Sequence, residues 1–134
     1  MKHIFFIFAA TFITQLMMPA YITAQDFINT DPSFNKVLVD TTYLTAVMTT
    51  FDPGKKTSTH THAAFFAYVL EGGTLDVHYE DGKVEILELK AGDNLYSGPE
   101  SPHWTINNGK KPIKILMVEL KEHPYMGNQK MVKK

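Results

Sequence analysis

The stretch GKKTSTHTHAAFFAYVLEGG, residues 54–73, holds two histidines one residue apart, followed by an apolar run that ends at two glycines. Alternate residues of a β-strand project to the same side, so a strand here places the rings of His60 and His62 on one face. Imidazole is a good ligand for zinc, iron, copper, nickel and manganese, and a pair on one rigid strand is preorganised for an ion. A His-x-His pair by itself is also common on protein surfaces, so the rest of the chain must decide between these interpretations.

Short β-rich segments separated by turn residues surround this stretch, and no segment has a convincing helical period. The dipeptide Asp81-Gly82 between two alternating runs predicts a β-hairpin. We predict strands at residues 36–40, 42–51, 65–71, 74–80, 83–89, 94–97, 103–107 and 113–120. A series of short strands like this indicates an all-β sandwich or closed barrel.

Two segments resemble the two sequence motifs of the cupin superfamily, in particular its small single-domain conserved-barrel members. The first motif is matched by Gly54, the pair His60-Thr61-His62 and the run that ends at Gly72. The second begins at Gly92-Asp93 and has His103 at the histidine place and Asn107 at the asparagine place. The resemblance extends over about residues 37–120, and it implies a double-stranded β-helix, also called a jelly-roll barrel.

The resemblance also implies a metal site, and here the chain departs from the family pattern. The glutamate of the first motif falls on Phe65, and the Pro-x-Gly of the second motif reads Gly98-Pro99-Glu100. The usual set of three histidines and one glutamate is thereby reduced to His60, His62 and His103. Similar cupins without the glutamate exist, including three-histidine iron dioxygenases. The expected cofactor is a divalent ion (Fe, Zn, Mn, Ni or Cu), and the sequence does not choose among them.

Aromatic residues near the histidines are candidates for the wall of a ligand pocket. Strand parity without a bulge puts Phe66 and Tyr68 on the same side as His60 and His62, and Trp104 follows His103 directly. The alternative is that these aromatics are plain core. Among other groups, His78 alternates with outward polar residues and His123 lies in the C-terminal tail, so we expect neither to be a ligand. Glu100 is either a proton shuttle or a solvated loop residue.

The domain boundaries follow from composition. Residues 1–24 have the charged, apolar, small-residue order of a secretory signal peptide, which predicts export to the periplasm or the extracellular space. Residues 25–35 form a polar N-terminal arm, residues 36–121 the cupin barrel, and residues 122–134 a polar tail. The chain has 134 residues, no cysteine and a net charge of -1, so we expect one soluble domain without disulfides.

The sequence also bears on which partners and activities to expect. A near-neutral chain without a basic stripe predicts no nucleic-acid binding, and signal cleavage leaves no membrane segment. We expect a small-molecule ligand, and a homodimer because the strand at 36–40 is an edge in need of cover. The first hypothesis for function is a dioxygenase-like oxidation, and the second is isomerisation or elimination on a sugar acid, which the lack of arginine disfavours. A non-catalytic ligand-binding or structural barrel is the alternative to both.

Overall fold

The computed structural model describes residues 26–127, which form one short helix and nine strands. The signal peptide predicted for residues 1–24 lies outside this range, as do residues 128–134 of the tail. The elements in chain order are α1 (Phe27–Thr30), β1 (Asn35–Asp40), β2 (Leu44–Phe51), β3 (His60–His62), β4 (Phe65–Glu71), β5 (Gly73–Tyr79), β6 (Val84–Leu89), β7 (Asn94–Ser97), β8 (Glu100–Asn107) and β9 (Ile113–Leu120).

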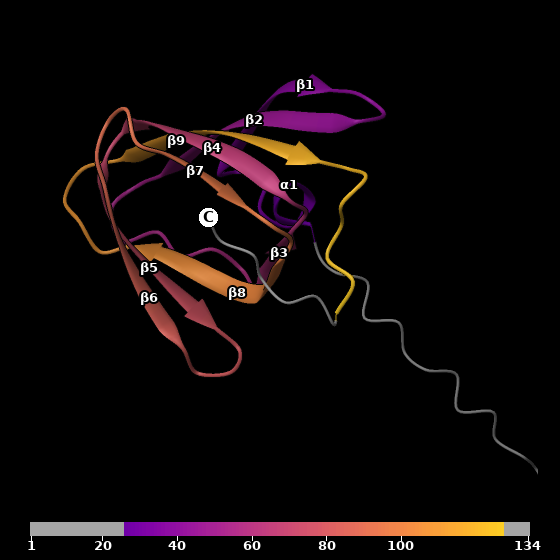
Figure 1. Cartoon of the computed structure of the whole chain (residues 1–134). Helices are drawn as coiled ribbons and strands as arrows, with labels where there is room; N and C mark the ends of the chain where they lie inside the picture. The colour runs from indigo at the N-terminus through magenta and orange to yellow at the C-terminus, as the bar shows by residue number, and fades with distance from the viewer. Residues whose placement is uncertain (1–25, 128–134) are drawn as a thin grey trace, which may run out of the picture.

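The strands form two antiparallel sheets that face each other (Figure 1). Five strands make one sheet in the order β1-β2-β9-β4-β7, and four make the other in the order β3-β8-β5-β6. Strands distant in sequence are neighbours, since β2 pairs with β9 and β3 pairs with β8. This is the topology of a double-stranded β-helix, so the predicted all-β jelly-roll fold is confirmed.

The chain passes from one sheet to the other at Ala63 and Ala64. These two residues connect β3, which carries both histidines, to the apolar strand β4. β3 pairs with β8 in the four-stranded sheet, whereas β4 pairs with β7 and β9 in the five-stranded sheet. At the crossing, the Ala64 N–H donates to the carbonyl of His123, and the Leu120 N–H donates to the carbonyl of Ala64. Because β3 and β4 belong to different sheets, the alternation of inward and outward side chains in β3 does not predict which side chains of β4 point inward.

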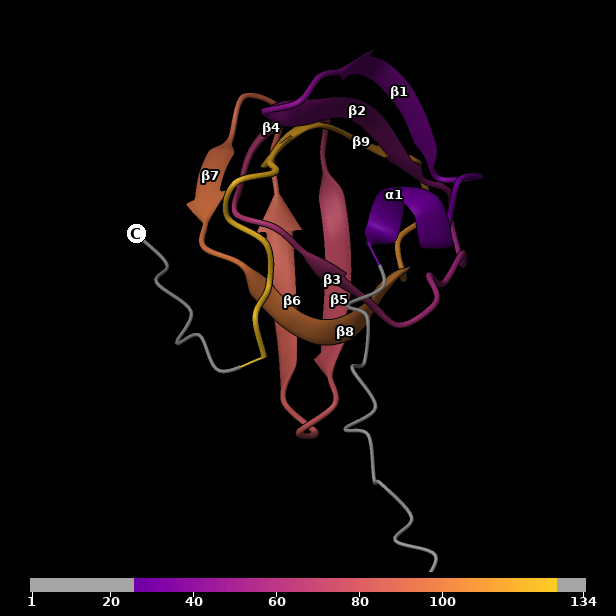
Figure 2. The ribbon, with the colours of Figure 1, turned by 90° about the vertical axis from the view of Figure 1, so that its right-hand side faces the viewer.

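The core lies between the sheets and is built by the inward side chains of both. Its buried apolar members come from α1 and four strands: Phe27, Ile28, Val47, Phe51, Phe65, Ala67, Leu75, Ile113 and Met117. Helix α1 contributes because Asp26 caps it, its carboxylate accepting a hydrogen bond from the Ile28 N–H at 3.0 Å. The segment expected to be a polar arm therefore contains a short helix that covers one end of the jelly roll and buries Phe27 and Ile28 (Figure 2).

Two turns show how glycine shapes the frame. The predicted hairpin forms between β5 and β6, with Gly82 at φ 86° and its N–H donating to the Tyr79 carbonyl. Gly72 lies at the turn between β4 and β5, where a Cβ atom would meet the Leu89 carbonyl oxygen at 2.2 Å.

Among the described residues, no helix has the length and apolar character needed to span a bilayer.

Candidate metal centre

Three histidines from two paired strands meet inside the jelly roll. His60 and His62 lie on β3, and His103 lies on β8 directly opposite His60 in the sheet register. The ring centroids are 4.5 Å apart for His60 and His103, 4.9 Å for His60 and His62, and 5.3 Å for His62 and His103. One ring nitrogen from each residue lies within 4.8 Å of the others, and all three side chains are buried.

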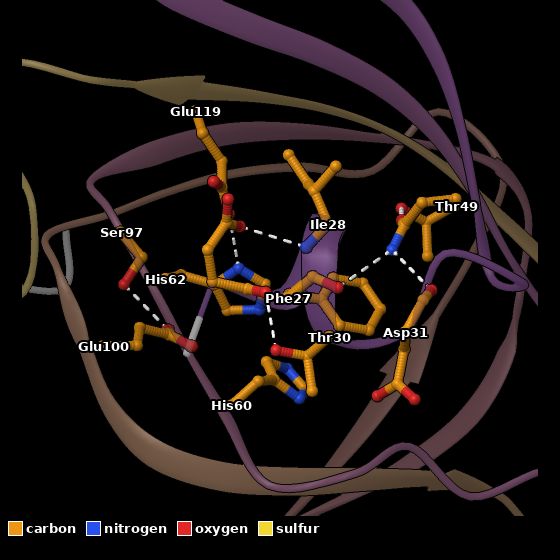
Figure 3. Close-up of polar contacts among 12 residues, drawn as sticks. Phe27, Ile28, Thr30, Asp31, Thr49, His60, His62, Ser97, Glu100 and Glu119 are labelled. Carbon is orange, nitrogen blue, oxygen red and sulfur yellow. Dashed lines mark hydrogen bonds and ion pairs between the residues drawn. The ribbon is translucent and has the colours of Figure 1, made fainter. Parts of the chain in front are cut away.

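Each imidazole is oriented by an acceptor on its Nδ1 side. Nδ1 of His60 lies 2.8 Å from the Ser58 carbonyl, and Nδ1 of His103 lies 2.8 Å from the Ser101 carbonyl. Nδ1 of His62 lies 2.6 Å from Oε1 of Glu119, a buried residue of β9 (Figure 3). An acceptor at Nδ1 assigns the proton to that nitrogen and the lone pair to Nε2, which is the arrangement of metal-binding histidines.

Electrostatics favour neutral rings at this position. Burial, together with the neighbouring His62 and His103 rings, lowers the pKa of His60 to about 2. Burial likewise lowers the pKa of His62 to about 3, with His103 adding to the effect and Glu100 opposing it. Neutral imidazole is the form that binds a cation, so these ligands need no deprotonation at neutral pH.

Glu119 stands behind His62 and was not singled out from the sequence. Burial raises the pKa of its carboxyl to about 7. A cation on Nε2 of His62 would hold the proton on Nδ1 and favour the ionised form of Glu119, which gives a carboxylate–histidine–metal relay. The sequence does contain a signal, because Glu119 has the same parity in β9 as the buried Ile113 and Met117.

A second carboxylate, that of Glu100, is buried on the cavity side of the cluster. Its Oε1 accepts a hydrogen bond from Oγ of Ser97 at 2.8 Å, and its Oε2 lies 3.8 Å from Nε2 of His103. The interpretation of Glu100 as a solvated loop residue is wrong, since β8 begins at this residue and its side chain is buried. The site thus has three imidazoles and two carboxylates. When ionised, the carboxylates would offset part of the positive charge of a bound cation.

A cavity of about 270 Å³ opens beside the cluster. His62 and Glu100 contribute polar atoms to its wall, and most of the remaining wall is apolar. The apolar lining comes from both sheets and from α1: Phe27, Phe51, Phe65, Ala67, Leu75, Leu87, Leu89, Leu95, Ile115 and Met117. A concave apolar site with a few convergent polar groups is typical of small-molecule pockets.

The structure does not bring Phe66, Tyr68 or Trp104 to this cavity, in contrast to the sequence-based expectation. Phe66 and Tyr68 are 42% and 39% exposed on the outer face of β4, because the sheet change at Ala63 and Ala64 reverses the parity. Trp104 stacks on His78 at a centroid distance of 3.7 Å, away from the cavity wall. Phe65 takes the inward place instead, with its ring centroid 5.0 Å from that of His62.

Phe27 covers the histidines from the helical end of the jelly roll. Its ring stacks on His60 at 4.3 Å and meets the edge of His62 at 5.3 Å (Figure 3). The sequence gives only a weak signal for this residue, an apolar pair after the helix-capping Asp26. His78 and His123 lie outside the cluster, as expected, because the cluster comprises His60, His62 and His103.

The fold and the histidine cluster define a small single-domain jelly-roll protein with a candidate metal site. A family model described as Cupin domain matches residues 47–119, more than half of the chain. The chain therefore belongs to the cupin family. The residues present fit the divalent ion that cupins commonly hold, because one ring nitrogen of each histidine lies within 4.8 Å of the others and every Nδ1 has an acceptor, which leaves Nε2 for the ion.

Solved structures agree with the fold. A cupin domain from Bordetella pertussis Tohama I has a TM-score of 0.60 at 20% identity, covering 65% of this chain and 91% of that chain. A double-stranded β-helix protein from Klebsiella pneumoniae has a TM-score of 0.52 at 24% identity, covering 74% and 81%. A polyketide cyclase from Streptomyces resistomycificus has a TM-score of 0.52 at 21% identity, covering 68% and 66%. No curated protein matches the chain in sequence.

Proposed function

We propose that this cupin binds a divalent transition-metal ion through Nε2 of His60, His62 and His103, and a small organic molecule in the adjoining cavity. The observation that carries the proposal is the convergence of three ring nitrogens within 4.8 Å, with an acceptor fixing each ring from behind. Nitrogens that share one ion at about 2.1 Å lie about 3–3.5 Å apart, so small ring movements complete the site.

The chemistry of the cavity favours an uncharged or weakly polar ligand. The ion, when bound, would supply Lewis acidity and, as iron, redox chemistry with dioxygen. The apolar wall excludes water and holds the ligand, while the buried carboxylate of Glu100 adds a polar group to the wall. Among the described residues, the lining contains two glutamates and no lysine, which opposes a sugar acid. We therefore place a dioxygenase-like oxidation ahead of isomerisation or elimination.

Metal analysis of protein purified without chelators or an affinity tag tests the metal site. We expect about one equivalent of a transition metal in the wild type and a sharp loss in His60→Ala and in His103→Ala. His78→Ala is the matched control, because this residue stacks on Trp104 outside the cluster and should leave metal content unchanged. Equal metal content in all three variants would contradict the proposal.

Oxygen consumption separates an enzyme from a binding protein. The assay uses iron-loaded protein with a panel of diketones, phenols and thiols, and His103→Ala loaded in the same way as the control. Turnover that depends on His103 supports the oxidation. Ligand binding without oxygen uptake supports the non-catalytic barrel instead.

Export, proposed from residues 1–24, is tested by fractionating cells and determining the N-terminus of the mature chain.

We also propose that two copies pair through the outer face of the five-stranded sheet. The strand register aligns one apolar row across all five strands: Val39, Ala46, Val118, Phe66 and Tyr96. Val39, Phe66 and Tyr96 are each between 42% and 47% exposed, and β1 is an edge strand. A continuous apolar row is a candidate interface, and an identical row on a second copy is complementary to it.

A further inference from the structure

The cupin site of this chain lacks a carboxylate at the place where the family motif has one. Phe65 occupies that place, and its buried ring packs beside His62 and lines the cavity. No rotation of Phe65 can supply a ligand atom. If an oxygen ligand completes the site, it must come from another strand.

Glu100 lies where such a ligand is needed. In the sheet register His62 is directly opposite Glu100, and His103 follows Glu100 by three residues on β8. The carboxylate therefore lies beside two of the three imidazoles.

The distances suit a shared cation better than a direct hydrogen bond. Oε2 of Glu100 is 3.8 Å from Nε2 of His103, which exceeds hydrogen-bonding distance. Two ligands of one ion at about 2.1 Å each lie about 3–3.5 Å apart. Oε2 is thus within about half an ångström of the separation expected for a ligand pair. The hydrogen bond from Ser97 to Oε1 holds the other oxygen and turns Oε2 toward the histidines.

The two buried carboxylates have different geometric relations to the rings. Glu119 contacts Nδ1 of His62 at 2.6 Å, so it stands behind the ring and positions it. Glu100 faces Nε2 of His103, the atom that would contact the ion. Only Glu100 is on the ligand side of the cluster.

We propose that Glu100 is the fourth protein ligand of the metal site, delivered by β8 in place of the missing β4 glutamate. The inference rests on the proposed three-histidine site and adds its oxygen donor. A set of three neutral nitrogens and one carboxylate leaves a net charge of +1 on a divalent ion. A six-coordinate ion held by these four groups would have two positions left for other ligands.

Cobalt binding tests the proposal without an activity assay. Apoprotein is titrated with Co²⁺ against a competing chelator, and the ligand-field absorption of the bound ion is recorded. We expect Glu100→Gln to weaken Co²⁺ binding at least about tenfold and to shift the ligand-field bands. Ser97→Ala, which removes only the hydrogen bond to Oε1, should produce a smaller weakening.

Glu85→Gln is the matched control, because Glu85 is another glutamate of the cavity wall but lies on β6. It should leave both the affinity and the spectrum near those of the wild type. Equal weakening by Glu85→Gln and Glu100→Gln would overturn the proposal, since the effect would then be one of cavity charge rather than ligation.

A crystal structure of the cobalt-loaded wild type decides the matter even if Glu100→Gln does not fold. A Glu100 oxygen at about 2.0–2.2 Å from the ion supports the proposal. An ion held by the three histidines, with both Glu100 oxygens beyond about 3 Å, overturns this inference and leaves the proposed function intact. A folded wild type that binds no Co²⁺ overturns both.

Discussion

Replacing Asn107 by alanine should destabilise the fold without touching the metal site. Asn107 occupies the asparagine place of the second cupin motif and is fully buried at the end of β8. Its Nδ2 donates to the carbonyls of Phe51 at 2.7 Å and Lys111 at 2.8 Å. Its Oδ1 accepts from the Gly109 N–H at 2.8 Å. One side chain therefore ties the end of β2 to the turn that leads into β9.

The magnitude follows from these three bonds. A net contribution of about 1 kcal/mol per bond gives about 3 kcal/mol, and the buried Phe51 carbonyl that loses its donor adds about 1–2 kcal/mol. We expect Asn107→Ala to lower the free energy of unfolding by about 4–5 kcal/mol. This is a large part of the 5–15 kcal/mol of a typical domain. Asn107→Asp should cost more, because a carboxylate presents oxygens where both carbonyls require donors.

The assay is equilibrium urea unfolding followed by circular dichroism, with metal content measured on the folded fraction. Asn108→Ala is the matched control, since this neighbouring side chain makes an exposed hydrogen bond to Asp76. It should cost less than about 1 kcal/mol. A loss below about 1 kcal/mol for Asn107→Ala, or equal losses at both positions, would refute the reasoning. Reduced metal content in the folded Asn107→Ala protein would show that the residue serves the site as well.

Three further predictions address the site, the helix and the outer face. Glu119→Gln should weaken Co²⁺ binding about 10–100-fold, because a neutral amide is a poorer acceptor for the His62 Nδ1 proton. The exposed Glu122→Gln is its control, and equal affinity in both variants would contradict a positioning role for Glu119. Phe27→Ala removes a ring that is 1% exposed and should lower the free energy of unfolding by about 3–5 kcal/mol in urea titrations. A loss below about 1 kcal/mol would show that α1 does not dock in solution. Phe66→Glu should convert a dimer into a monomer in light scattering after size exclusion, with metal content unchanged; a monomeric wild type would contradict the proposed pairing.

The sheet pattern was largely readable from local sequence. Alternation and turn residues located eight strands, because a half-buried strand must alternate and a tight turn needs residues such as Gly82. β3 was absent from those predicted ranges, and β8 begins three residues earlier than predicted. Both differences lie at the histidines, where each strand is defined by its pairing partner rather than by apolar alternation.

Helix α1 was missed for a different reason. Four residues are too few to show a helical period, and their stability depends on docking rather than on propensity. Phe27 is buried because its ring packs on Phe51 and His60 at the end of the jelly roll. That surface exists only after β2 and β3 have come together.

The sequence by itself determined the fold class and, through its resemblance to the cupin motifs, the three histidines that meet. Spacing along one strand is a local property, and His60 and His62 needed nothing more to share a face. Only the tertiary structure decided which groups surround them. The crossing at Ala63 and Ala64 turned Phe65 inward and Phe66 outward, and the pairing of β3 with β8 put Glu100 opposite His62. Parity and cross-strand register depend on which sheet each segment joins, and that choice is made by the packing of the whole chain.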